Sequence, residues 1–190
     1  MKKLILVTSP PACGKTHVSI ALSKALDHVV YLDKDTLIPL SKRIFAVAGE
    51  EYNRSSQFFE ENIRNYEYEV IVDLALEALD YDDLVLINAP FTREVRDLAY
   101  MNELRRRLAA KGADLCVIWV ETSIEVCRQR MMKRNSSRDT WKLAHWDEYI
   151  ATRDYTIPSG IPELRIFKNS SDEEFTAALK ETVQYLHGEL

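Results

Sequence analysis

The sequence predicts an α/β protein of three layers (α/β/α), in which helices cover both faces of a five-stranded parallel sheet. Short apolar runs occur at residues 3–8, 28–32, 84–88, 115–120 and 164–168. They are continuous rather than alternating, which is typical of strands buried on both faces. Helical patterns separate them, so strand and helix alternate along the chain. This order predicts right-handed crossovers within one domain of residues 1–190.

Apolar spacing of three to four residues predicts helices at 15–26, 57–79, 94–110, 123–134 and 172–187. In the second helix, the side chains expected to face the core are Phe59, Ile63, Tyr66, Val70 and Leu74. In the last helix they are Phe175, Leu179, Val183 and Leu186. Residues 122–125, Thr-Ser-Ile-Glu, have the spacing of a capping box, which predicts that Thr122 caps the fourth helix.

Composition restricts the class of protein. With 46% hydrophobic and 29% charged residues, the 190-residue chain suits one domain. The net charge of -5 argues against a long nucleic acid as partner. No apolar run approaches the roughly 18 residues of a membrane span. Three dispersed cysteines indicate neither a disulfide framework nor a zinc site, so we expect a cytoplasmic protein; the oligomeric state stays open.

Residues 9–16, Ser-Pro-Pro-Ala-Cys-Gly-Lys-Thr, connect the first strand to the first helix and match a phosphate-binding P-loop except that Ser9 replaces glycine. Gly14 allows the backbone N–H groups to turn toward a β-phosphate. Lys15 is expected to reach the β- and γ-phosphates, and the Thr16 hydroxyl to coordinate Mg²⁺. The alternative is an ordinary turn that uses glycine for its backbone freedom. Cys13 is expected to be a small apolar filler, with a redox switch as the less favoured alternative.

Two carboxylates, Asp33 and Asp35, follow the second strand. The carboxyl ends of such strands border the ligand crevice, and two residues spaced by one project to the same side while the chain stays extended. Asp35 is therefore interpreted as the base that accepts a hydroxyl proton, and Asp33 as the residue on the magnesium side. Helix capping near Thr36 is the alternative role, and the two roles are compatible.

With these residues in view, the sequence resembles the small P-loop kinases, within the AAA-family ATP-binding proteins. The group includes gluconate kinase, adenylyl-sulfate kinase, chloramphenicol phosphotransferase, polynucleotide 5'-hydroxyl kinases and zeta-toxin-like kinases. The similar segments are residues 32–35 (Leu-Asp-Lys-Asp), 86–91 (Leu-Ile-Asn-Ala-Pro-Phe), 120–134 and 167–170 (Phe-Lys-Asn-Ser). The chain departs from the pattern at three positions: Ser9, Lys34 in place of glycine, and Asn88 where relatives often carry Asp.

The resemblance implies a P-loop nucleoside triphosphate hydrolase fold and the cofactors ATP and Mg²⁺. The residues it assigns to ATP are Pro11, Ala12, Cys13, Gly14, Lys15, Thr16, His17, Arg130 and Asn169. It also implies an arginine-rich lid at 128–142, carrying Arg128, Arg130, Arg134 and Arg138, in which Arg130 or Arg134 contacts the transferring phosphate. A solvated basic helix end is the alternative interpretation of these arginines.

The predicted function is transfer of the γ-phosphoryl group of ATP to the hydroxyl of a small acceptor. Residues 41–80 are expected to form the helical acceptor-binding region, where Arg54, Arg64 and Tyr68 are candidates; Arg93 is a better one because it follows a strand end. Two alternatives stay open. Ser9 and Asn88 allow an ATP-binding regulatory protein with slow or no hydrolysis, and a zeta-toxin-like kinase of a nucleotide sugar is the other.

Overall fold

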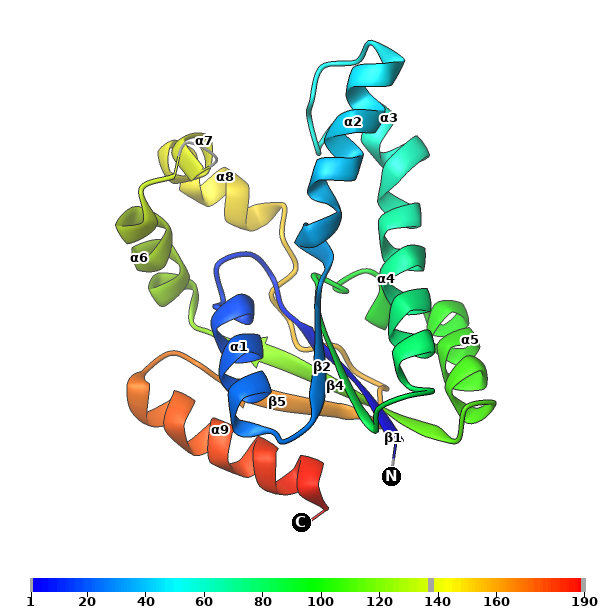
Figure 1. Cartoon of the computed structure of the whole chain (residues 1–190). Helices are drawn as coiled ribbons and strands as arrows, with labels where there is room; N and C mark the ends of the chain where they lie inside the picture. The colour runs from blue at the N-terminus through cyan, green and yellow to red at the C-terminus, as the bar shows by residue number, and fades with distance from the viewer. Residues whose placement is uncertain (1, 137–138, 189–190) are drawn as a thin grey trace.

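The five strands are all parallel and lie in the order β2, β3, β1, β4, β5 in the computed structural model, which describes residues 2–136 and 139–188 (Figure 1). The strands are β1 (Lys2–Thr8), β2 (Val29–Asp33), β3 (Leu84–Asn88), β4 (Ala113–Glu121) and β5 (Leu164–Lys168). The predicted fold class and all five predicted strands are confirmed. The strand order reverses at β1, the strand that leads into residues 9–16, and ligands bind at such a switch point in open α/β sheets.

Two helical layers cover the sheet. On one face α4 (Asn65–Ala78) and α5 (Leu98–Ala109) pack against side chains that include Leu4 and Leu6. On the other face α1 (Lys15–Ala25) and α9 (Asp172–His187) pack against Ile5 and Val7. Neighbouring residues of β1 therefore point to opposite layers, as a strand requires. Phe175, Leu179, Val183 and Leu186 of α9 face this second core, as predicted.

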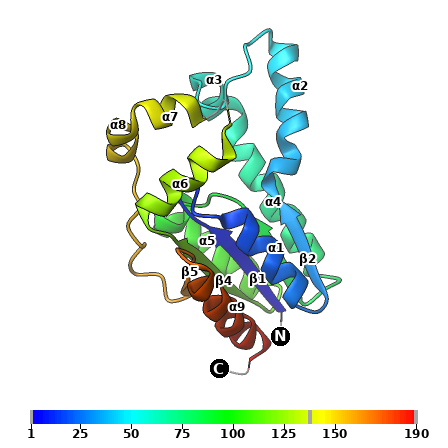
Figure 2. The same cartoon turned by 90° about the vertical axis from the view of Figure 1, so that its left-hand side faces the viewer.

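The remaining helices form two groups beyond the carboxyl ends of the strands (Figures 1 and 2). One group contains η1 (Lys34–Leu37), α2 (Ile38–Ala48), α3 (Gln57–Phe59), the π-helical turn η2 (Glu60–Arg64) and the amino-terminal part of α4. The other contains α6 (Ile124–Arg134), α7 (Thr140–Ala144) and α8 (Trp146–Ala151). The short η3 (Glu94–Arg96) precedes α5. None of the described helices has the length and apolarity needed to cross a membrane.

The predicted inward stripe of the second helix is wrong beyond Ile63. Phe59 and Ile63 are buried, but Tyr66, Val70 and Leu74 are 63%, 42% and 43% exposed. The π-helical turn at Glu60–Arg64 explains the difference, because a wider turn inserts an extra residue and shifts the phase of the following helix. The positions one residue later, Glu67, Ile71 and Ala75, are the buried ones.

The predicted cap of the fourth helix is also wrong by one residue. Ser123 is the N-cap of α6, and its hydroxyl accepts a hydrogen bond from the N–H of Val126. The hydroxyl of Thr122 instead donates to the carbonyl oxygen of Cys13, 2.8 Å away. A tertiary contact thus takes the side chain that the local pattern assigns to capping.

Candidate active site

Residues 9–14 form a tight turn between β1 and α1, and Lys15 and Thr16 begin α1. Ala12 and Gly14 both have left-handed backbone, with φ of 67° and 88°. Gly14 is also required sterically: a Cβ there would lie 2.5 Å from Nδ2 of Asn169 and 3.1 Å from a guanidinium nitrogen of Arg130. Gly14 caps α1, so the turn ends at the positive end of an 11-residue helix. This arrangement suits a bound anion.

Three side chains from distant parts of the chain donate to the carbonyl oxygen of Cys13. The distances are 2.8 Å from Thr122 Oγ1, 2.7 Å from Asn169 Nδ2 and 3.1 Å from the Arg130 guanidinium. Arg130 also donates to the carbonyl oxygen of Asn169 at 2.8 Å. The loop is thereby attached to the ends of β4 and β5, and two predicted nucleotide ligands, Arg130 and Asn169, lie directly against it.

Asn88, at the end of β3, joins the predicted magnesium and phosphate residues. Its Oδ1 accepts a hydrogen bond of 2.7 Å from Lys15. Its Nδ2 lies 2.7 Å from Asp33 Oδ2 and 3.3 Å from Thr16 Oγ1. The strand register explains the grouping, because Asn88 is paired with Val7 of β1 and with Asp33 of β2. Burial lowers the pKa of Lys15, while the nearby carboxylates of Asp35 and Asp33 oppose the shift.

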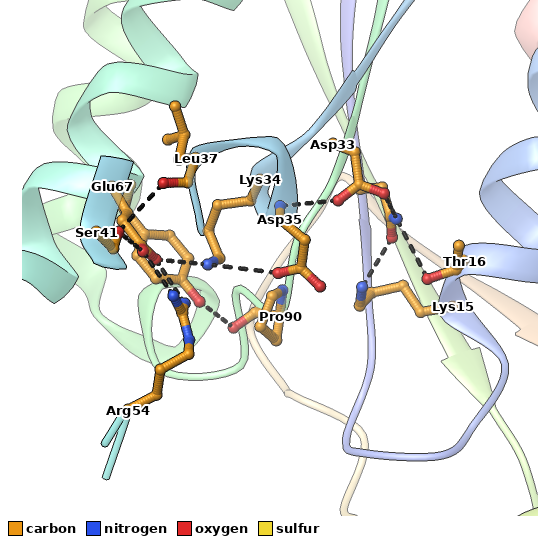
Figure 3. A network of polar contacts seen from close by, with 12 residues as sticks. Lys15, Thr16, Asp33, Lys34, Asp35, Leu37, Ser41, Arg54, Glu67 and Pro90 are labelled. Atoms are coloured by element: carbon orange, nitrogen blue, oxygen red, sulfur yellow. Dashed lines mark hydrogen bonds and ion pairs between the residues drawn. The ribbon is translucent and has the colours of Figure 1, made fainter. Parts of the chain in front are cut away.

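Asp33 and Asp35 do not project as a strand pair, because the extended backbone ends at Asp33. The next four residues form η1, and Oδ1 of Asp33 accepts a 2.9 Å hydrogen bond from the N–H of Asp35. The capping role considered for the pair thus belongs to Asp33, and it coexists with the contact to Asn88. The side chain of Asp35 is 67% exposed. Figure 3 shows it between the group around Lys15 and the group around Lys34.

A buried polar cluster behind Asp35 was not predicted from the sequence. Lys34 is 2% exposed, and its ammonium lies 2.8 Å from Oε2 of Glu67 and 3.8 Å from Oδ1 of Asp35. Both carboxylate oxygens of Glu67 accept from the guanidinium of Arg54 at 2.7 Å, and Ser41 donates to Oε1 (Figure 3). Burial alone would raise the pKa of Glu67, but the hydrogen bonds from Arg54, Lys34 and Ser41 lower it to about 2.

The arginines of the predicted lid have different partners. Arg134, at the end of α6, is paired with the fully buried carboxylate of Asp139, which also accepts from Lys142 at 3.0 Å. The guanidinium of Arg128 lies over the ring of Trp146, 5.6 Å from its centroid. Arg138, although part of the predicted lid, lies outside the described residues, as does Ser137. Arg130 and Arg134 both line the cavity described next, and Arg130 also contacts the loop, whereas Arg128 contacts an aromatic ring.

Two adjoining cavities flank residues 9–11. The first, of about 430 Å³, is lined by the predicted nucleotide residues Pro11, Ala12, Gly14, Lys15, Thr16, His17, Arg130 and Arg134, together with Asp35. Cys13 and Asn169, 1% and 2% exposed, lie behind its wall, and the ring of His17 packs against Phe175. The second cavity, of about 530 Å³, lies toward α4 and contains all four acceptor candidates, Arg54, Arg64, Tyr68 and Arg93. Ser9, Pro10, Pro11 and Pro90 line both.

The acceptor candidates are already engaged within the protein. Arg54 pairs with Glu67, and Arg64 donates to buried Glu94 at 2.6 Å. Tyr68 donates to the carbonyl oxygen of Pro90 at 3.0 Å. Arg93 pairs with Glu60 at the exposed rim, where 65% of the Arg93 side chain is accessible.

The oxygen atoms near Asn88 fit a magnesium site completed by a ligand. Thr16 offers a hydroxyl and Asp33 a carboxylate, which are hard donors of the kind that Mg²⁺ prefers. Among the described residues there is no cluster of three or more His, Cys, Asp or Glu that could hold a metal by itself. Mg²⁺ usually binds through one or two protein oxygens, water and substrate phosphates.

Several solved structures share the fold of this chain. A proposed kinase of Chloroflexus aurantiacus superposes with a TM-score of 0.66 at 19% identity, covering 100% of this chain and 98% of the other. A gluconokinase of Sinorhizobium meliloti has a TM-score of 0.56 at 14% identity, with 99% and 97% coverage. The APS kinase of Mycobacterium tuberculosis, solved with AMPPNP and APS, has a TM-score of 0.56 at 18% identity, with 98% and 97% coverage.

At these identities the likeness establishes the fold. A search of the curated proteins finds no match to the chain. A family profile described as AAA domain matches residues 4–155, which include the phosphate-binding loop, Asp33, Asp35, Asn88 and the arginines of α6. The chain therefore belongs to the AAA domain family of P-loop proteins.

Proposed function

We propose that the protein is an ATP-dependent kinase that transfers the γ-phosphoryl group of Mg·ATP to a hydroxyl group of a small acceptor. The observation that carries the proposal is the pair of adjoining cavities, one walled by the phosphate-binding loop and one by η1, α4 and Pro90. A regulator that only binds nucleotide has no need of the second cavity. A phosphotransferase needs it beside the first.

The proposed roles follow from the contacts. The loop N–H groups and Lys15 hold the phosphates, and Arg130 and Arg134 bring positive charge to the group in transfer. Thr16 and Asp33 would hold Mg²⁺, which supplies charge between the phosphates. The exposed carboxylate of Asp35 accepts the proton of the acceptor hydroxyl.

The lining of the second cavity favours an acceptor that carries an anionic group. Six basic side chains line it, against three acidic ones: Lys34, Arg54, Arg64, Arg93, Arg96 and Arg153 against Glu60, Glu67 and Asp154. Arg153 is exposed and its guanidinium lies 5.5 Å from the ring centroid of Tyr149, a contact that leaves its N–H groups able to donate to a bound carboxylate or phosphate. Sugar acids and phosphorylated sugars or nucleosides are the first compounds to test.

The test is a screen of hydroxylated acceptors with ATP labelled on the γ-phosphate, using the wild type and Asp35→Asn. We expect the wild type to label at least one acceptor and Asp35→Asn to lower its turnover by roughly 10²- to 10⁴-fold, with ATP affinity changed only slightly. Asp27→Asn, at an exposed position after α1, is the matched control and should retain full activity. If ATP binds but no acceptor is labelled and turnover stays negligible, the protein is an ATP-binding regulator and the kinase proposal is wrong.

A further inference from the structure

Two thiols lie in contact behind the phosphate-binding loop. The Sγ atoms of Cys13 and Cys127 are 3.6 Å apart, and the two residues are 1% and 0% exposed. Cys13 belongs to the loop, whereas Cys127 belongs to α6, the helix that carries Arg130 and Arg134. They are 114 residues apart in the sequence, so only the fold brings them together.

We propose that Cys13 and Cys127 form an oxidative modification site, at which a peroxide converts the two thiols into a disulfide that ties the phosphate-binding loop to α6. A disulfide has an S–S length of about 2.05 Å, so the sulfur atoms must approach each other by roughly 1.5 Å. The effect of the disulfide on ATP binding rests on the proposed function, whereas formation of the disulfide does not.

The surroundings distinguish the two thiols. The hydrogen bond between the two thiols lowers the pKa of Cys127, and the positive charge of Arg130 acts in the same direction. The same pairing raises the pKa of Cys13, and burial adds to that shift. We take Cys127, on the same helix as Arg130, as the thiolate that attacks the oxidant; attack by Cys13 would give the same disulfide, because the two sulfur atoms are in contact. Because both are buried, the oxidant reaches them through a local opening between α6 and the loop.

The reaction balances in two steps. The Cys127 thiolate attacks one oxygen of hydrogen peroxide, the O–O bond breaks, and Cys127 becomes a sulfenic acid while hydroxide leaves and is protonated to water. The Cys13 sulfur then attacks the sulfenic sulfur, the S–O bond breaks, and a second water forms with the thiol proton. One peroxide is reduced, two thiols are oxidised to one disulfide, and a dithiol reductant reverses the change.

The disulfide would disturb the loop because Cys13 is held there by its own carbonyl oxygen. That oxygen accepts hydrogen bonds from Thr122, Asn169 and Arg130. The next residue, Gly14, is closely packed: a Cβ there would lie 2.5 Å from Nδ2 of Asn169 and 3.1 Å from the guanidinium of Arg130 on α6. A shift of Cys13 toward α6 therefore strains these contacts and moves N–H groups that would bind phosphate. Oxidation is expected to lower ATP affinity by about tenfold or more.

The experiment treats the full chain with hydrogen peroxide, blocks free thiols, and analyses tryptic peptides by mass spectrometry, with ATP affinity measured by calorimetry in parallel. Trypsin places Cys13 in peptide 4–15, whereas Cys116 and Cys127 share peptide 112–128. Cys116→Ala removes this ambiguity and is the matched control, since Cys116 is buried in the sheet and its burial raises its pKa to about 11. Cys127→Ser removes the proposed nucleophile.

We expect peptides 4–15 and 112–128 to be linked in oxidised wild type and in Cys116→Ala, and not in Cys127→Ser. ATP affinity should fall in the first two proteins, recover with dithiothreitol, and stay within about twofold in oxidised Cys127→Ser. Absence of the linked peptide in oxidised wild type overturns the proposal, whether or not Cys127→Ser folds. If oxidised Cys127→Ser loses as much ATP affinity as oxidised wild type, the disulfide is not the cause of the loss. If reduced wild type binds no ATP, the proposed function fails while the linked peptide still reports the modification.

Discussion

The ammonium group of Lys15 lies 2.7 Å from Oδ1 of Asn88. The contact joins the first turn of α1 to the end of β3, and the same amide donates to Asp33 at 2.7 Å. A neutral amide positions Lys15 without cancelling its charge, so the ammonium can exchange this contact for phosphate oxygens. Asn88, a departure from the pattern of related kinases, therefore acts here as the connecting residue of the candidate site.

Replacement of Lys15 by alanine should weaken ATP binding by about tenfold to a hundredfold, because a charge-assisted hydrogen bond contributes about 1.5–3 kcal/mol. The fold should remain cooperative, since burial disfavours the charged form of Lys15 in the free protein. Calorimetric titration with Mg·ATP is the measurement. Lys24→Ala, an exposed lysine in the last turn of α1, is the control. Equal affinities for wild type and Lys15→Ala would show that the loop does not bind ATP.

Replacement of Asn88 by aspartate should make stability depend on Mg²⁺. The new carboxylate would lie against Asp33, where Nδ2 of Asn88 now donates, so two like charges meet and a hydrogen bond is lost; the ammonium of Lys15, 2.7 Å from Oδ1, offsets part of this repulsion. We expect a lower melting temperature without Mg²⁺, with much of the loss recovered when Mg²⁺ and ATP are added. Asn53→Asp adds the same charge in a loop where the side chain accepts a hydrogen bond from the N–H of Ser55, and should change little. If both variants melt alike, repulsion at Asp33 is not the cause.

The sequence was sufficient to predict the sheet because each strand is a continuous apolar run and each crossover contains a helical pattern. It was insufficient for the helix over residues 57–79, because periodicity assumes a constant 3.6 residues per turn. The π-helical turn at Glu60–Arg64 breaks that assumption, so Tyr66, Val70 and Leu74 are exposed although their spacing is regular.

The candidate site shows the same division between local pattern and tertiary contact. Gly14, Lys15 and Thr16 can be recognised in the sequence because their proposed role in phosphate binding depends on consecutive residues of one loop. Glu67 carries no such signal: it is one of many glutamates in a helical stretch, and its importance arises from Lys34 and Arg54, which come from η1 and the loop after α2. Likewise, the contact of Cys13 with Cys127 depends on how α6 packs against the loop.

Acid should destabilise the protein through Glu67. Its pKa of about 2 lies below the ordinary value of 4.5. The contribution of Glu67 to stability is therefore complete above pH 4.5 and is lost as the pH falls toward 2. A shift of this size corresponds to about 3 kcal/mol. The measurement is the free energy of unfolding, from denaturant titrations between pH 6 and about pH 3.

Glu67→Gln should be less stable than the wild type at pH 6, because it leaves Lys34 buried without its full charge partner, a change that typically costs about 3–5 kcal/mol. Its stability should also fall less steeply with acid. Glu60→Gln removes a carboxylate paired with Arg93 at the exposed rim and should change stability by about 1 kcal/mol or less. If the free energy of unfolding falls equally with acid in wild type and Glu67→Gln, Glu67 is not the group responsible for acid sensitivity.

Nucleotide binding should change the partners of Arg134. In the free protein this guanidinium is paired with the buried carboxylate of Asp139, which also holds Lys142, and all three belong to the predicted lid of residues 128–142. Closure over ATP would transfer Arg134 to the phosphates, while Arg130, already against the loop, needs little movement. A non-hydrolysable ATP analogue with Mg²⁺ should therefore slow hydrogen exchange in residues 128–136 and 139–142 more than in α9. The Arg130→Ala, Arg134→Ala double variant should lose this protection and most of its activity, whereas Arg128→Ala, which removes the contact with Trp146, should keep both. Unchanged exchange in the wild type, or full activity of the double variant, would mean that these arginines form only a solvated surface.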